Sequence, residues 1–171
     1  MAQHIELNPV SHLTIGAVGE PGKRIFYLQG SKGPDTLSLI VEKVQAQMLA
    51  DSFESLLEEL GRQSAEIKSR IEVSAVIDFR LREPLDSLFR VGNIGLGFDE
   101  NSERIVLVAY EAVPEEEEPN AVSFWAPPEH IKALIQHVRT VVKAGRPICG
   151  NCGQPIDPEG HWCPQRNGHK K

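Results

Sequence analysis

Hydrophobic and polar positions along the chain predict two successive groups, each of three strands and one helix. In the first group, short apolar runs separated by turn residues indicate strands at 13–18, 24–28 and 36–41. Apolar side chains at helical spacing then indicate a helix from about 45 to 60, with a buried stripe of Met48, Leu49, Phe53, Leu56, Leu57 and Leu60. We expect Gly61 to end this helix, because glycine is common just past a helix C-terminus.

The second group repeats this order. Apolar runs indicate strands at 91–98, 104–110 and 121–125, and Pro127-Pro128 opens a helix that reaches about residue 143. The apolar stripe of this helix is Ile131, Leu134, Ile135, Val138 and Val142.

A few residues suggest that the two groups are related. Ile15-Gly16 matches Ile94-Gly95, and Arg24-Ile25 matches Arg104-Ile105. An unrelated meander followed by a helix would give the same element order, so this alternative stays open.

The shared order predicts an α+β domain at 1–146, in which an antiparallel sheet is covered by two helices. Its similar halves would span about 1–62 and 88–146, in a pseudo-twofold arrangement. A separate tail follows at 147–171.

Length and composition agree with one ordinary core. The chain has 171 residues, of which 40% are hydrophobic and 25% charged. The N-terminus lacks the basic and apolar regions of a signal peptide, and no apolar run approaches the roughly 20 residues of a membrane helix. We therefore expect a soluble cytoplasmic protein with no membrane contact.

Charge is spread unevenly. The net charge is −6, yet residues 130–171 hold seven basic and two acidic residues. This asymmetry indicates either a basic surface for an anionic partner or a tail that docks on its own acidic body, and the second interpretation is favoured.

The tail contains the one feature with recognisable chemistry. Cys149 and Cys152 form a CxxC pair, and His161 and Cys163 follow as an HxC pair. Two such pairs can complete a tetrahedral zinc site, and a site closed by four protein ligands is structural. The sequence predicts one structural Zn²⁺ per chain, with His169 as an alternative to His161.

The same cysteines leave a second interpretation open. A CxxC pair also occurs in dithiol redox proteins, where the first cysteine lies at a helix N-terminus. Gly150, Gly153 and Pro155 surround the pair here, so zinc is favoured over redox chemistry.

Four cations lie on one side of the second helix and just beyond it. Lys132, Arg139, Lys143 and Arg146 could contact a phosphate backbone. A solvated helix face is the commoner meaning of such a stripe, and the acidic chain as a whole disfavours nucleic acid.

Catalytic motifs are missing from the sequence. It contains no GxSxG, HExxH or strand-following GxGxxG pattern. We expect His4, His12, His130 and His137 to be surface or helix residues rather than catalysts.

The tail from Cys149 to Gly168, together with Phe89–Gly92 and Ala144–Pro147, resembles a bacterial family of proteins of unknown function, number three thousand and ninety. The resemblance implies a compact bacterial protein, often encoded near a phosphomutase-like and a kinase-like protein, and it implies no activity. Members typically carry Pro at the position of Gly150 and Tyr at that of His169, and the second difference favours His161 as the ligand.

The favoured function is a noncatalytic binding or adaptor module for a protein partner, stiffened by zinc, which uses its sheet edges or its basic helix. The alternative is an enzyme with a small-molecule cleft between the two halves. A pocket with convergent polar groups would favour the enzyme, and a flat patch would favour the binding module.

Overall fold

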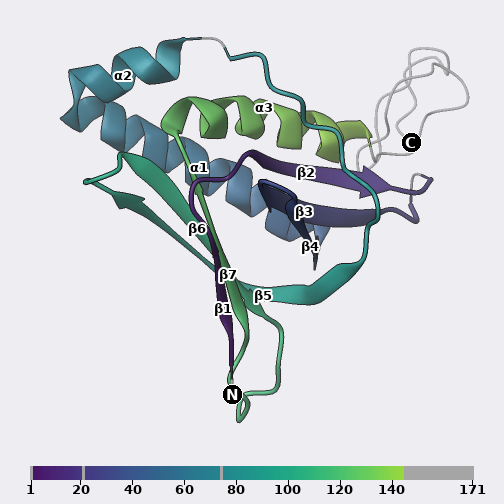
Figure 1. Cartoon of the computed structure of the whole chain (residues 1–171). Helices are drawn as coiled ribbons and strands as arrows, with labels where there is room; N and C mark the ends of the chain where they lie inside the picture. Colours follow the sequence, from purple (N-terminus) through teal and green to yellow (C-terminus); the bar gives the residue numbers. More distant parts are fainter. Residues whose placement is uncertain (1, 21, 74, 145–171) are drawn as a thin grey trace, which may run out of the picture.

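The structure confirms the α+β class (Figure 1). It is a computed structural model that describes residues 2–20, 22–73 and 75–144, so the predicted zinc tail lies outside the described residues. The strands are β1 (His4–Leu7), β2 (His12–Val18), β3 (Ile25–Lys32), β4 (Asp35–Val41), β5 (Ser87–Asp99), β6 (Arg104–Glu111) and β7 (Ala121–Ala126). The helices are α1 (Lys43–Gln63), α2 (Ala65–Glu72) and α3 (Pro128–Ala144).

The strands form a seven-stranded mixed sheet in the order β1-β7-β6-β5-β4-β3-β2. Each predicted group is an antiparallel meander, β2-β3-β4 or β5-β6-β7. The meanders join through a parallel β4/β5 pair, and β1 adds a parallel strand beside β7. The order strand, strand, strand, helix therefore occurs in both halves, as the sequence predicts.

The predicted pseudo-twofold arrangement is wrong. A twofold axis would bring equivalent strands together at the junction, whereas the last strand of the first meander, β4, pairs with the first strand of the second, β5. The two meanders therefore follow each other head to tail. The long connection through α1 and α2 allows this order, because it returns the chain to β4 in a parallel direction.

Strand β5 changes partner along its length. Ser87 and Arg90 pair with β4, and from Val91 onward the strand pairs with β6. The register shifts between Val91 and Ile94, and Gln45 of α1 donates hydrogen bonds to the Val91 and Gly92 carbonyls there, at 3.0 and 2.9 Å. The helix thus satisfies backbone groups that the irregularity leaves free.

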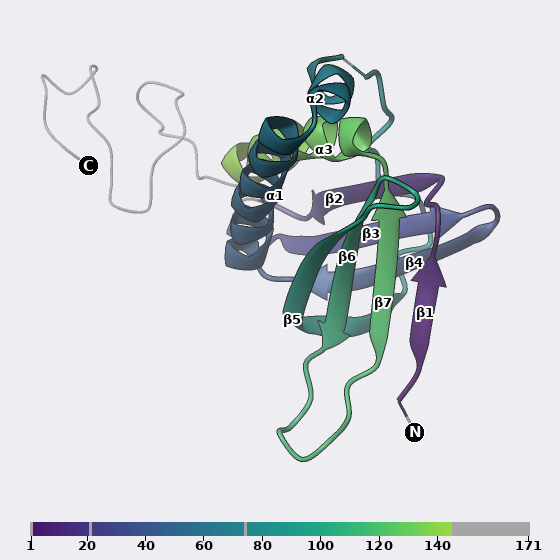
Figure 2. The ribbon, with the colours of Figure 1, turned by 90° about the vertical axis from the view of Figure 1, so that its left-hand side faces the viewer.

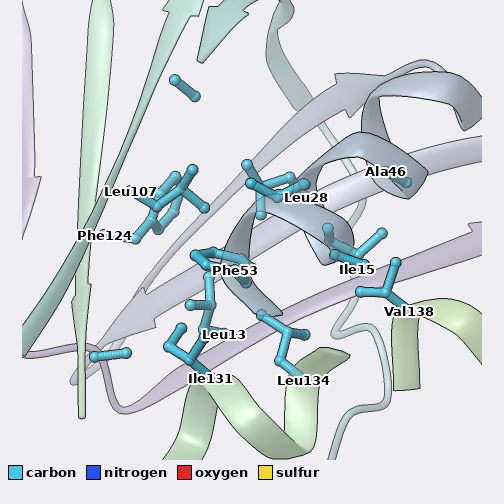
Figure 3. Close-up of a cluster of buried hydrophobic side chains, with 14 of the residues drawn as sticks. Leu13, Ile15, Leu28, Ala46, Phe53, Leu107, Phe124, Ile131, Leu134 and Val138 are labelled. Atoms are coloured by element: carbon cyan, nitrogen blue, oxygen red, sulfur yellow. The ribbon is translucent and has the colours of Figure 1, made fainter. Parts of the chain in front are cut away.

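The core lies between the sheet and the helices α1 and α3 (Figure 3). Leu13 and Ile15 alternate with polar residues on β2, so both point to the helices, where they meet Phe53 of α1 and Leu134 of α3. All four side chains are fully buried. Truncating a buried aromatic such as Phe53 to Ala typically costs about 3–5 kcal/mol.

Two details of the first predicted helix are wrong. Met48 is 62% exposed, in a hollow between α1 and β5. Gly61 lies inside α1, which continues to Gln63. Ser64 ends the helix instead, because its side chain accepts a hydrogen bond from the Ile67 amide at 3.2 Å and starts α2.

An extended segment, residues 75–86, connects α2 to β5 and crosses strands β2 and β3 (Figure 1). Ala75, Ile77, Phe79 and Leu81 are partly buried, whereas the residues between them are exposed. This period of two places one row of side chains against the body. The segment therefore covers the first meander on the side opposite the helices.

Candidate functional site at the edge of strand β2

A row of polar residues crosses the first meander on the face opposite α1 and α3. Thr14, Gln29 and Ser38 lie side by side in register on β2, β3 and β4, and all three are buried. A buried polar side chain without a hydrogen-bond partner is costly, so these three side chains need partners on this face of the sheet.

Segment 75–86 supplies those partners. The Gln29 amide donates to the Arg82 carbonyl and accepts from the Arg82 backbone N–H, each at 2.8 Å. It also donates to the Ser38 hydroxyl at 3.0 Å, and the Thr14 hydroxyl donates to the Phe79 carbonyl at 2.7 Å. The side chain of Gln29 therefore pairs with the segment as a neighbouring strand would.

Three histidines gather where this segment passes β2. His12 of β2 is 3% exposed and donates through Nε2 to Gln29 Oε1 at 3.2 Å. His130 of α3 donates through Nε2 to the Leu13 carbonyl at 3.0 Å. The Phe79 ring stacks on His137 with a centroid distance of 4.7 Å and meets His130 edge-on at 5.7 Å.

Burial lowers the pKa of all three imidazoles from the ordinary value of 6.5. For His12, the positive charge of Arg82 lowers the pKa further. At the helix residues a hydrogen bond to the backbone opposes the shift, to Leu13 for His130 and to Ile15 for His137. All three side chains are therefore mainly neutral near pH 7.

These contacts close the edge of the sheet. Strand β2 is the last strand on its side, so its outer backbone groups would otherwise be free to pair with another chain. His130 occupies the carbonyl of Leu13 instead, and helix α3 packs beside β2. The prediction that sheet edges hold a partner is therefore not supported at this edge.

Asp78, the carboxylate that acts on His12, is engaged by another side chain. Hydrogen bonds from Arg80 at 3.0 Å lower the pKa of Asp78 well below its usual range. Such a group stays ionised and is a poor proton donor near pH 7. Within the described residues, Nε2 of His137 is buried without a hydrogen-bond partner.

The prediction that His12 is a surface or helix residue is wrong, because His12 is buried on strand β2. His130 and His137 are helix residues as expected, and His4 is exposed on β1. Gln29, the centre of the network, was missed. One usable signal was the polar positions that alternate with apolar ones on both β2 and β3.

A groove of about 510 Å³ lies between α1, α2 and α3. Its apolar lining includes Leu57, Ile71 and Ile135, each from a different helix. The lining also contains carboxylates and cations: Glu54, Glu58, Glu72, Arg62, Lys68, Lys132 and Arg139. A concave apolar surface with charges of both signs at its rim is typical of a binding site.

Two residues of the predicted basic stripe, Lys132 and Arg139, line this groove. Arg139 is already engaged, because it donates to Glu54 at 2.8 Å and to Asp51 at 3.0 Å. These hydrogen bonds raise the pKa of Arg139 and lower that of Glu54. Lys143 lies in a neighbouring hollow, and Arg146 is outside the described residues.

The predicted zinc ligands Cys149, Cys152, His161 and Cys163, and the alternative His169, also lie outside the described residues. Among residues 2–20, 22–73 and 75–144, no three His, Cys, Asp or Glu side chains are placed to hold a metal ion. The helices of that same part of the chain lack the combination of length and hydropathy needed to cross a bilayer.

Comparisons with known proteins identify a family. Neither the curated proteins nor the solved structures gave a match. One family model matches residues 5–163, a span that covers the body and reaches the last of the predicted zinc ligands. The chain therefore belongs to the family described as protein of unknown function DUF3090.

Proposed function

We propose that this protein is a noncatalytic binding module that holds a segment of a protein partner in the groove between α1, α2 and α3, and that its tail binds one structural zinc ion. The observation that carries the binding role is the groove itself. Leu57 and Ile135, each 5% exposed, and the partly buried Ile71 form its apolar lining, and charged residues also line it.

The charges at the rim indicate what kind of segment fits. Arg62, Lys68 and Lys132 can meet acidic side chains, whereas Glu58 and Glu72 can meet basic ones. An amphipathic helix with apolar residues at three- and four-residue spacing and charges of both signs suits such a groove. This partner class follows from the chemistry of the groove.

One feature of the groove favours binding over catalysis. Arg139 donates a hydrogen bond to Glu54 in its lining, and this contact lowers the pKa of Glu54. A carboxylate held in the ionised form by an arginine is weak as a general acid and as a general base.

The enzyme alternative keeps one supporting observation. The groove lies between α1 of the first half and α3 of the second, which is where a cleft between the halves was expected. A small-molecule substrate in this groove would contact the same lining residues as a protein segment would.

The test places a photo-crosslinking amino acid at Gln136, an exposed residue that lines the groove. We expect a discrete protein adduct when the full-length protein is irradiated in cells. Lys132→Glu, which reverses a rim charge, should reduce its yield. The matched control places the same group at Lys32, which is exposed at the end of β3.

Equal adducts from Gln136 and Lys32, or an adduct that is insensitive to Lys132→Glu, would contradict the groove as the binding site. An adduct with the mass of a small molecule would favour the enzyme alternative instead.

The zinc part of the proposal rests on Cys149, Cys152, His161 and Cys163, whose types and spacing suit a closed tetrahedral site. The family match reaches Cys163 and so includes all four residues. Such a site would order a Gly- and Pro-rich tail that has no periodic apolar pattern of its own. The dithiol alternative for Cys149 and Cys152 instead predicts a protein without zinc, whose two thiols cycle to a disulfide.

A further inference from the structure

A hollow of about 490 Å³ lies beside the start of α1. The proposed binding groove lies towards the other end of that helix. Three cations line it from separate parts of the chain: Arg24 just before β3, Lys43 at the start of α1, and Arg90 on β5. Among the residues that the structure describes, Glu42 is the one carboxylate in its lining. The lining therefore carries two net positive charges in a chain whose net charge is −6.

The three cations differ in how far they are neutralised. Arg90 forms an ion pair with Glu42, in which both side chains are more than half exposed. Arg24 has neutral partners: it donates to the Val141 carbonyl at 3.3 Å, and its guanidinium lies 5.8 Å from the centre of the Phe26 ring. Those contacts hold the guanidinium in place, and neither of them neutralises its charge.

Four of the eight described arginines have a carboxylate partner, and Arg24 is among the other four. Arg70, Arg80 and Arg139 each lie within 3.5 Å of at least one carboxylate oxygen. Among the described residues, neither Arg24 nor Lys43 has a carboxylate within ion-pair distance. Two cations without a counter-charge in one concave site favour an anionic ligand.

The apolar part of the lining limits the ligand class further. Ile25 and Ile40 lie on neighbouring strands at the side of the hollow, and Ile25 is 47% exposed. The hollow is larger than an inorganic anion needs and falls in the range of small-molecule sites. From this geometry we infer that the hollow binds the phosphate group of a small phosphomonoester, whose remaining part contacts Ile25 and Ile40.

Phosphate is the better match than a carboxylate because its dianion can accept hydrogen bonds from several donors at once. Arg24, Lys43 and Arg90 approach from three elements, so they can contact different oxygens. Glu42 would compete with the ligand for Arg90. Removing the charge of Glu42 should therefore strengthen ligand binding, whereas removing a cation should weaken it.

The experiment titrates the full-length protein with inorganic phosphate and with phenyl phosphate at constant ionic strength, followed by two-dimensional amide NMR. We expect saturable shifts confined to residues near 22–26, 40–43 and 90, with tighter binding of phenyl phosphate. Arg24→Gln and Lys43→Gln should each weaken binding by at least about tenfold, as expected for the loss of a charge-assisted hydrogen bond.

Glu42→Gln should tighten binding, because it removes the competing negative charge and keeps a side-chain acceptor for the helix cap. Lys32→Gln is the matched control, since it removes an exposed lysine elsewhere and should leave binding unchanged. Shifts that do not saturate, or that Lys32→Gln weakens as much as Lys43→Gln does, would overturn the proposal. So would weaker binding in a folded Glu42→Gln variant.

Discussion

The two meanders share an element order but differ in how they are covered. The first, β2-β3-β4, packs against α1 and α3 on one face and lies under segment 75–86 on the other. Figure 2 shows the strands of the second meander, β5, β6 and β7, side by side. On their face away from the core, Val106 and Val108 are partly exposed and Tyr110 is 38% exposed.

The polar residues follow this difference. The doubly covered meander holds Thr14, Gln29 and Ser38 in a buried network, because segment 75–86 offers backbone partners. On the more open meander, β5 carries Gly95 and Gly97 on the outer face, opposite Val108 and Val106, and glycine has no side chain that needs a partner. Similar local patterns therefore lead to different surfaces once a distant segment covers one of them.

The largest expected effect comes from breaking the covered network. Gln29→Met removes the hydrogen bonds to His12, Ser38 and both backbone groups of Arg82, and leaves several buried polar groups unsatisfied. We expect the free energy of unfolding to fall by about 3 kcal/mol, measured by urea denaturation.

Ser123→Ala is the control on the second meander. Ser123 is also buried, and it accepts one hydrogen bond, from Trp125 Nε1 at 3.2 Å. Its loss should cost about 1 kcal/mol. Equal losses for the two variants would contradict the difference between the meanders.

The two meanders also differ in how much room they leave for a side chain at a glycine position. A Cβ atom at Gly30 would lie 2.5 Å from the buried Phe124 ring, whereas a Cβ at Gly97 would meet no atom within 4 Å. Gly30→Ala should therefore destabilise the fold by about 1–3 kcal/mol. Gly97→Ala should be neutral or raise stability by up to about 1 kcal/mol, because it restricts the unfolded chain. Thermal unfolding of both variants checks the pair, and a larger loss for Gly97→Ala would refute this explanation.

A smaller effect is expected from pH. Burial lowers the pKa of His12, His130 and His137 below the ordinary 6.5, so the folded state favours the neutral imidazoles. As the pH falls below 6.5, the unfolded chain binds more protons than the folded chain, and stability declines towards the lowered pKa values. Melting temperatures at about pH 7.5 and about pH 5.5 measure this decline.

His137→Phe should make the decline shallower, because it removes one buried titrating group and keeps a ring against Phe79. His4→Gln is the control, since His4 is exposed on β1. An unchanged slope in His137→Phe, or a flatter slope in His4→Gln, would disagree with the role of the buried cluster.

The smallest effect concerns the ion pairs between the helices of the two halves. Arg139→Gln removes the contacts to Asp51 and Glu54, both of which are exposed carboxylates. Exposed pairs contribute little and are screened by salt, so we expect a melting temperature close to that of the wild type. A loss as large as that of Gly30→Ala would show that this contact has been undervalued.

Local periodicity was enough to predict most of the fold. Strands β2 to β7 and helices α1 and α3 were placed to within a few residues, because their apolar patterns reflect the faces that are buried. The four-residue strand β1 was missed, since so short a segment has no clear period. The head-to-tail order of the meanders depends on strand pairing between distant residues, which local patterns do not encode.

The candidate sites were harder to predict for the same reason. Gln29 and His12 are distinctive because segment 75–86 covers them, about 50 residues later in the chain. The groove requires three helices to meet, and the exposed Met48 shows that an apolar helical position is not always a core position. The zinc ligands, in contrast, are predicted from residue type and spacing alone.

The most direct test of the central claim, that zinc orders the tail, is the metal content of the purified native protein beside a Cys149→Ser, Cys152→Ser variant. We predict about one zinc per chain, lost in the variant, while the body keeps its melting transition. Protein without zinc, whose thiols react readily and cycle to a disulfide, would contradict the claim and favour the dithiol redox alternative.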